Sequence, residues 1–173
     1  NLVMPVARMY MRKMVGHLVL DAESDALNDT LEKAAASGEQ LNLNLLGEAV
    51  LGEEEAKSRA HRTLDLIKNP RVTYVSVKAS SMVAQLNNWD IGSSVERLKD
   101  RLRPLYQEAA RRNPQVFINM DMEEYHDLHL TLRLFKSLMS EPEFKNLESG
   151  IVLQAYLPDT FDALQDIAEF AKQ

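Results

Sequence analysis

The fold is decided by the segments Val-Thr-Tyr-Val-Ser-Val-Lys-Ala-Ser at residues 72–80 and Val-Phe-Ile-Asn-Met-Asp at residues 116–121. Side chains alternate between the two faces of a β-strand. In the first segment valines alternate with serines and Lys78, and in the second Ile and Met alternate with Phe, Asn and Asp121. Each predicted strand therefore has one apolar face and one face that carries polar groups.

Two further segments show the same alternation. Residues 41–46 place leucines opposite asparagines, and residues 150–156 place Gln154 towards the carboxyl end of the last strand. A helical stretch follows each strand, which is the pattern of a parallel sheet built from βα units. The predicted helices cover residues 53–68, 93–112, 124–140 and 160–172.

The two-faced strands favour a barrel over a doubly wound sheet. Helices cover both faces of a doubly wound sheet, so its strands read as almost wholly apolar. In a barrel the helices cover only the outer face, and the site lies at the carboxyl ends of the strands. Lys78, Asp121 and Gln154 share that end and the polar face, and such residues are costly to bury without partners. A structural ion pair between Lys78 and Asp121, without chemistry, is the alternative.

Two helices are predicted ahead of these units. Residues 2–20 have apolar side chains at helical spacing with basic residues between them, a pattern that packs on its own domain or lies on a membrane surface. The second helix covers residues 24–37 and stops at Gly38. We therefore divide the chain into a helical lead-in, residues 1–40, and four βα units, residues 41–173.

Local signals place the helix starts. Three consecutive glutamates at residues 53–55 suit the positive end of a helix dipole. Ser93 or Ser94 can cap the next helix, and Pro104 is expected to kink it.

Composition excludes several classes of protein. The 173 residues are 45% hydrophobic and 27% charged, which is typical of a globular domain. The absence of cysteine excludes disulfides and thiolate chemistry, and it fits a cytosolic protein. The net charge of -6 argues against nucleic-acid binding. We expect no signal peptide and no membrane-spanning segment, because no charged-then-apolar segment opens these residues and no apolar run is long enough to cross a bilayer.

Other motifs carry weaker hypotheses. His126 and His129 have a spacing that could bind a metal, but a solvated pair on an amphipathic helix is the preferred interpretation, so we expect no metal site. Ser80 and Ser81 lack a recognisable base for nucleophilic catalysis. Residues 45–49 match neither a dinucleotide turn nor a P-loop.

Four further segments occur in order along the chain. They are Leu-Leu-Gly-Glu-Ala-Val at residues 45–50, Val-Ser-Val-Lys-Ala-Ser-Ser-Met at 75–82, Ile-Asn-Met-Asp-Met-Glu-Glu at 118–124 and Gly-Ile-Val-Leu-Gln-Ala-Tyr at 150–156. These segments resemble consecutive motifs of the proline dehydrogenase family. The lead-in segment Met-Val-Gly-His-Leu-Val at residues 14–19 resembles the form found in bacterial bifunctional proline utilization enzymes.

The resemblance implies a distorted (βα)8 barrel of the TIM type that holds FAD and oxidises L-proline to Δ1-pyrroline-5-carboxylate. The hydride passes to the flavin, and a quinone at the membrane then takes the electrons. In bifunctional members a separate aldehyde dehydrogenase domain uses NAD. The implied location is the cytoplasm, at or near the inner face of the membrane.

The resemblance also implies roles for individual residues. Lys78 matches a lysine that anchors the substrate carboxylate. Asp121 matches an aspartate near both flavin and substrate, and it is our catalytic candidate. Met122 and Gln154 match positions that contact the flavin, as Asp121 does. Glu48 belongs to the first motif, and we assign it no role.

The resemblance covers only half a barrel, namely four of its eight strands. A fifth strand with a flavin-binding motif and a later helix with paired arginines are not found in these residues. We therefore expect a fragment that is inactive alone and that self-associates through exposed sheet edges. The alternative is a non-catalytic half-barrel that serves as a scaffold or an interaction module.

Overall fold

The computed structural model describes the chain except residues 1–2, 16–24, 46–49, 51, 88 and 123. Contacts divide the chain into two compact units, residues 1–39 and 40–173. The first unit contains the helices α1 (Val3–Val15) and α2 (Asp25–Ala36). The remainder of the predicted first helix, residues 16–20, lies outside the described residues.

Helix α2 ends where its sequence indicates. Gly38 has φ +74, a conformation that glycine adopts without the penalty that a Cβ brings. The backbone N–H groups of Gly38 and Glu39 donate to the carbonyls of Ala35 and Ala34 at 3.1 and 2.9 Å. These two bonds form a Schellman motif and confirm Gly38 as the helix stop.

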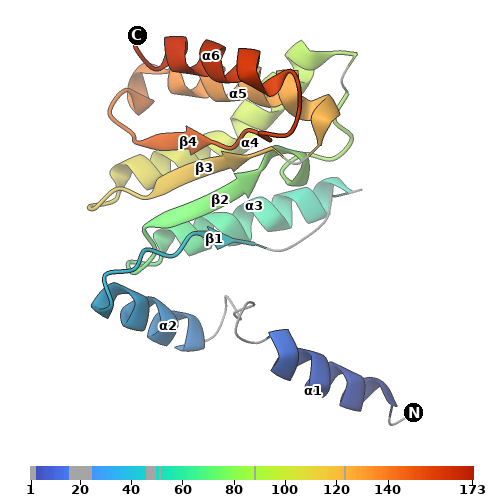
Figure 1. The fold of residues 1–173 in the computed structure, drawn as a ribbon, viewed down its shortest axis with the longest axis vertical. Helices are drawn as coiled ribbons and strands as arrows, with labels where there is room; N and C mark the ends of the chain where they lie inside the picture. The colour runs from blue at the N-terminus through green and yellow to red at the C-terminus, as the bar shows by residue number, and fades with distance from the viewer. Residues whose placement is uncertain (1–2, 16–24, 46–49, 51, 88, 123) are drawn as a thin grey trace. The chain divides into compact units, whose positions relative to one another are not determined.

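The second unit is a four-stranded parallel sheet with the order β1-β2-β3-β4 (Figure 1). Three short 3₁₀ turns, η1 (Ala79–Ser81), η2 (Tyr125–Asp127) and η3 (Pro142–Phe144), interrupt its connections. The strands and helices alternate as β1 (Leu43–Asn44), α3 (Glu53–Lys68), β2 (Tyr74–Lys78), α4 (Ile91–Arg111), β3 (Phe117–Asp121), α5 (Leu128–Met139), β4 (Ser149–Ile151) and α6 (Thr160–Phe170).

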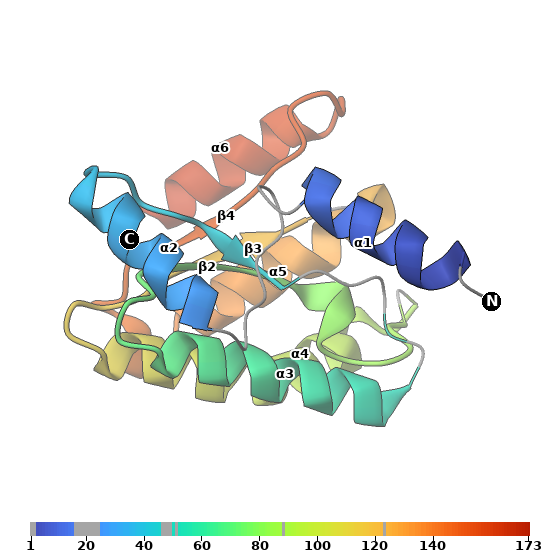
Figure 2. The same cartoon turned by 90° about the horizontal axis from the view of Figure 1, so that it is seen from below.

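Strand order and helix order both follow the sequence. Helix α3 packs on α4, α4 on α5, and α5 on α6 (Figure 2). A doubly wound sheet reverses its strand order at a switch point, whereas this sheet grows in one direction, as the wall of a barrel does. The expected α/β fold with a partial TIM-like barrel is confirmed.

The helix-facing side of the sheet forms the core. Val75, Val77, Ile118 and Met120 are at most 1% exposed. These are the apolar residues that alternation assigned to one face. The opposite face carries Ser76, Lys78, Asn119 and Asp121 by the same alternation.

The observed strands are shorter at the edges than expected. Strand β1 has two residues and β4 has three, against predictions of residues 41–46 and 150–156. After Ile151 the chain forms one more sheet bond, from the Val152 N–H to the Met120 carbonyl, and then turns. An edge strand is hydrogen-bonded to only one neighbouring strand, and it ends where that pairing ends. The alternation of apolar and polar residues continues beyond this point, so it overestimates the length of the strand.

The cap of α4 differs from the prediction. Asp90 occupies the N-cap, and its Oδ1 accepts from the backbone N–H of Ser93 at 3.1 Å. The Ser94 hydroxyl is used elsewhere, donating to the Asn87 carbonyl at 3.0 Å. Helix α4 continues through Pro104. Among the described residues, none of the helices is both long and apolar enough to cross a membrane.

Candidate functional site

The structure brings Lys78 and Asp121 together. They are register partners, each the last residue of its strand, in the neighbouring strands β2 and β3. Partners in register lie on the same face of a sheet, so a cation and a carboxylate stand side by side on the polar face. Both side chains are half-buried.

Carboxamides hold the Asp121 carboxylate from two strands. Asn119 Nδ2 donates to its Oδ1 at 2.8 Å, and Asn44 Nδ2 on β1 donates to its Oδ2 at 3.2 Å. The Ser76 hydroxyl accepts from Asn42 at 2.9 Å and from Asn119 at 3.4 Å. This network fixes the orientation of the carboxylate and leaves it an acceptor.

The loop after β2 is held in place from α3 and α4. The Ser81 hydroxyl donates to the Lys78 carbonyl at 2.8 Å. Arg97 and Arg101 donate to the carbonyls of Ala84 and Met82 at 3.0 and 3.3 Å. Arg101 also pairs with Glu53, and its hydrogen bond lowers the pKa of Glu53 although burial opposes the shift. These hydrogen bonds connect the backbone that follows Lys78 to helices α3 and α4.

Gln154 lies in the segment that follows β4, at the same end of the sheet. Its backbone carbonyl accepts from the Thr160 hydroxyl at 2.7 Å and from the Leu157 N–H at 3.1 Å. Thr160 is buried and is the first residue of α6. The main chain of Gln154 is thereby fixed to the start of that helix.

Met122 is placed apart from these groups. It is buried in an apolar cluster with Leu128, Leu132 and Ala163. Ile151, Leu153, Leu157 and Ile167 pack against this cluster. Alternation explains the placement, because the residue after Asp121 turns towards the opposite face. The predicted contact of Met122 with a flavin stays a prediction, and Glu48 lies outside the described residues.

The sequence analysis missed a second cation near the site, and this one is buried. Arg59 of α3 is 6% exposed and lines a small cavity together with Asn44, Lys78 and Ser81. Its Nη2 lies 3.7 Å from Glu55 Oε1. A signal was present, because Arg59 shares a helix face with the buried residues Ala56 and Thr63.

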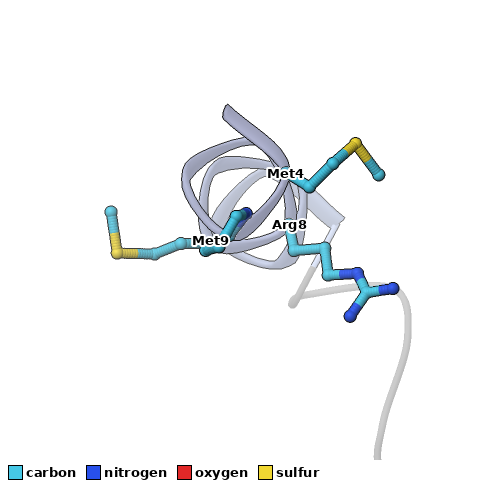
Figure 3. Close-up of a pocket in the computed structure, with 4 residues that line it drawn as sticks. Met4, Arg8 and Met9 are labelled. Carbon is cyan, nitrogen blue, oxygen red and sulfur yellow. The ribbon is translucent and has the colours of Figure 1, made fainter. Parts of the chain in front are cut away.

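Two other features lie outside this arrangement. His126 Nε2 lies 3.3 Å from Glu124 Oε2 and 3.4 Å from Asp127 Oδ1, and among the described residues no group of three or more histidine, aspartate or glutamate side chains is placed to hold a metal ion. A hollow along α1 is lined by Met4, Pro5, Arg8 and Met9 (Figure 3). Met9 projects to one side of the helix while Met4 and Arg8 project to the other, so these side chains enclose nothing.

Comparison with known proteins identifies the family. The model of the family described as Proline dehydrogenase matches residues 27–173. The chain belongs to the proline dehydrogenase family. A flavin cofactor goes with proline dehydrogenases in general.

Two relatives of this member of the proline dehydrogenase family are named as bifunctional proteins. It is 28% identical to the Bifunctional protein PutA of Klebsiella aerogenes over 170 residues, which are 86% of this chain and 13% of that protein. The same identity and coverage hold for the Bifunctional protein PutA of Escherichia coli K12. The chain thus spans 13% of the length of these two relatives.

Solved structures agree with the proline dehydrogenase assignment. Proline Utilization A (PutA) from Corynebacterium freiburgense is 63% identical with a TM-score of 0.90, over 94% of this chain and 17% of that one. PutA from Bdellovibrio bacteriovorus, inactivated by N-propargylglycine, is 34% identical with a TM-score of 0.77, over 86% of this chain and 18% of that one. The chain is therefore similar to a proline dehydrogenase segment of PutA.

Proposed function

We propose that these residues form the first four βα units of an FAD-dependent barrel that oxidises L-proline to Δ1-pyrroline-5-carboxylate. The observation that carries the proposal is the pairing of Lys78 with Asp121 on one polar face, at the carboxyl ends of adjacent strands. Family membership supports the same activity.

The side chains suit an amino acid and a flavin in different ways. Lys78 supplies a cation for the substrate carboxylate, and the buried Arg59 adds positive charge beside it. Asp121, held by Asn44 and Asn119, offers an oriented acceptor to a cationic amine. The Gln154 amide both donates and accepts, which matches the mixed edge of a flavin ring.

The protein groups in this proposal bind and orient. A bound flavin would supply the acceptor for the hydride, which carries the electron pair that the substrate loses. Lys78 and Asp121 hold the two charged ends of the amino acid, which limits the orientations it can adopt. The main chain of Gln154 is fixed by its carbonyl bonds, which limits the positions that its side-chain amide can reach.

The proposal can be extended from this segment to the whole protein. PutA relatives are described as bifunctional, so we infer a parent chain with an NAD-dependent aldehyde dehydrogenase domain. We also infer a quinone at the membrane as the electron acceptor and a cytoplasmic location. On the same proposal the isolated 173 residues do not turn over proline.

Removal of the Lys78 charge tests the substrate role. In an intact enzyme that contains this segment, Lys78→Met is expected to lower kcat/KM for L-proline by roughly 10- to 100-fold, mainly through KM. The physical reason is the loss of one charge-assisted hydrogen bond to the substrate carboxylate. Lys68→Met is the matched control, because it removes an exposed lysine at the end of α3.

Flavin content is measured on the same samples from the visible absorbance. Full flavin content with a raised KM in Lys78→Met, and no change in Lys68→Met, supports the proposal. An unchanged KM in Lys78→Met contradicts it. A scaffold function is favoured by the exposed apolar residues Tyr156, Phe161 and Leu164, and an intact enzyme that binds no flavin would support that alternative.

A further inference from the structure

A hydrogen bond joins the two loops that follow strands β3 and β4. The Tyr125 phenol, four residues after Asp121, donates to Oδ2 of Asp159, five residues after Gln154. Both side chains lie at the carboxyl end of the sheet, in the segments that follow these strands. The contact spans 34 positions of sequence, so it is made by the fold and not by local chain geometry.

Asp159 occupies a position where an aspartate ordinarily does something else. It is the N-cap of α6, yet its side chain accepts no bond from that helix. Asp90 at the N-cap of α4 does accept from the Ser93 N–H, which is the usual reason for an aspartate at this position. The Asp159 carboxylate is therefore committed to Tyr125 and not to its own helix.

This contact is mechanically connected to Gln154. Thr160, adjacent to Asp159, donates its hydroxyl to the Gln154 carbonyl at 2.7 Å. Beneath the two loops, Met122 from one and Leu157 from the other belong to the same apolar packing. The Tyr125–Asp159 hydrogen bond and the packing of Met122 with Leu157 therefore both link the two loops.

We propose that Tyr125 and Asp159 are positioning residues, whose hydrogen bond sets where the Gln154 amide lies relative to the Asp121 carboxylate. The consequence for a flavin rests on the proposed function, whereas the link between the loops does not. The hydrogen bond to Asp159 also raises the pKa of Tyr125, so the phenol keeps the proton that it donates. We call the hydrogen bond between Tyr125 and Asp159 the latch.

The test compares variants that break the latch with one that breaks a neighbouring contact. Tyr125→Phe and Asp159→Ala remove the donor and the acceptor, and Asp159→Asn keeps an oxygen that accepts. Asp166→Asn is the matched control. It removes the 2.6 Å ion pair between Lys136 of α5 and Asp166 of α6, which joins the two helices that follow these loops.

Two measurements are made on the intact, flavin-loaded enzyme. Hydrogen exchange at the Leu157 and Thr160 amides reports on the loop after β4, because these amides donate to the carbonyls of Gln154 and Leu157. Tyr125→Phe and Asp159→Ala are expected to speed that exchange and to raise the FAD dissociation constant, each by about tenfold. Compared with Asp159→Ala, Asp159→Asn is expected to restore much of the slow exchange and of the FAD affinity. The double variant Tyr125→Phe with Asp159→Ala adds little to either single change. Asp166→Asn leaves the exchange rate and the FAD dissociation constant unchanged.

Each result has a stated consequence. Unchanged exchange in Tyr125→Phe overturns the latch. Faster exchange with an unchanged FAD dissociation constant overturns the positioning role. If Gln154→Ala itself leaves the FAD dissociation constant unchanged, the proposed flavin role of Gln154 fails, and hydrogen exchange still decides whether the bond links the two loops.

Discussion

Gly150 makes room for two side chains of the polar face. It is the register partner of Asn119. A Cβ built at Gly150 would lie 2.9 Å from Cζ of Phe117 and 3.1 Å from Oδ1 of Asn119. Phe117 is itself held by an edge-on contact with Tyr74, with ring centroids 4.9 Å apart. Both neighbours are held by contacts of their own, so a side chain at this position would force at least one of them to shift.

Gly150→Ala is expected to destabilise the fold by about 1–3 kcal/mol, the usual cost of forcing extra volume into a packed region. The added methyl group also displaces Asn119, which donates to Asp121. Urea unfolding at low protein concentration measures the change. Gly92→Ala is the control, since its nearest neighbour would lie 3.8 Å away, and a gain of up to about 1 kcal/mol is expected there. Equal effects of the two substitutions would contradict the steric argument.

At the scale of elements, Glu141 joins α4 to the turn between α5 and η3. Arg103 donates to both carboxylate oxygens of Glu141, at 2.6 and 3.2 Å, and Lys99 lies 3.1 Å away. The Glu141 side chain is 18% exposed. The hydrogen bond from Arg103 lowers the pKa of Glu141, with Lys99 contributing and burial opposing. Such a bidentate ion pair fixes the relative geometry of the two side chains more closely than a single hydrogen bond does.

The lowered pKa of Glu141 makes its ion pairs with Arg103 and Lys99, called the clamp, sensitive to acid. A carboxyl whose pKa is lower in the folded state stabilises the fold above its unfolded pKa, here 4.5, and loses that contribution as the pH falls through the folded value. Glu141→Gln is therefore expected to cost roughly 1–3 kcal/mol at pH 7. It also flattens the decline of the unfolding free energy below about pH 4.5. Urea unfolding across that pH range measures both effects.

The control for the clamp is an exposed glutamate. Glu54 pairs with Lys57 at 2.9 Å, and its side chain is 88% exposed. Glu54→Gln is expected to change stability by less than about 0.5 kcal/mol at any pH, because solvent screens such pairs. If both glutamines behaved alike, the assignment of acid sensitivity to Glu141 would be wrong.

The sequence predicted long elements better than short ones. The helix expected at residues 53–68 has those bounds, because apolar spacing and three glutamates at its start agree. The edge strands were overestimated, since their ends depend on a neighbour and not on alternation. The α4 cap was assigned to Ser93 or Ser94 although Asp90 fills it. Serine and aspartate both cap helices well, and only the path of the backbone decides which residue occupies the N-cap.

The site was predictable where strand register carries it. Alternation alone places Lys78 and Asp121 on one face, and the register then makes them neighbours. The bond between Tyr125 and Asp159 has no such signal, because it joins two irregular segments. Side-chain contacts between loops depend on the path of the backbone, which no periodicity describes.

At the scale of the whole molecule, apolar side chains are exposed around the last βα unit. Phe161 and Leu164 lie one turn apart on α6 and are 65% and 53% exposed, and Tyr156 is exposed in the preceding loop. Strand β4 has β3 as its only partner among the described residues. An open sheet edge beside exposed apolar surface is a pairing template for another chain.

The isolated 173 residues are therefore expected to self-associate, with a mass above 19.6 kDa that rises with concentration. Adding charge to the apolar surface should reverse this, because Phe161→Asp with Leu164→Asp makes burial of that surface costly. Gln165→Asp adds a charge to an exposed position of the same helix and should leave association unchanged. Light scattering over a concentration series measures the mass. A wild-type monomer at every concentration would show that neither the β4 edge nor the α6 surface recruits a second copy.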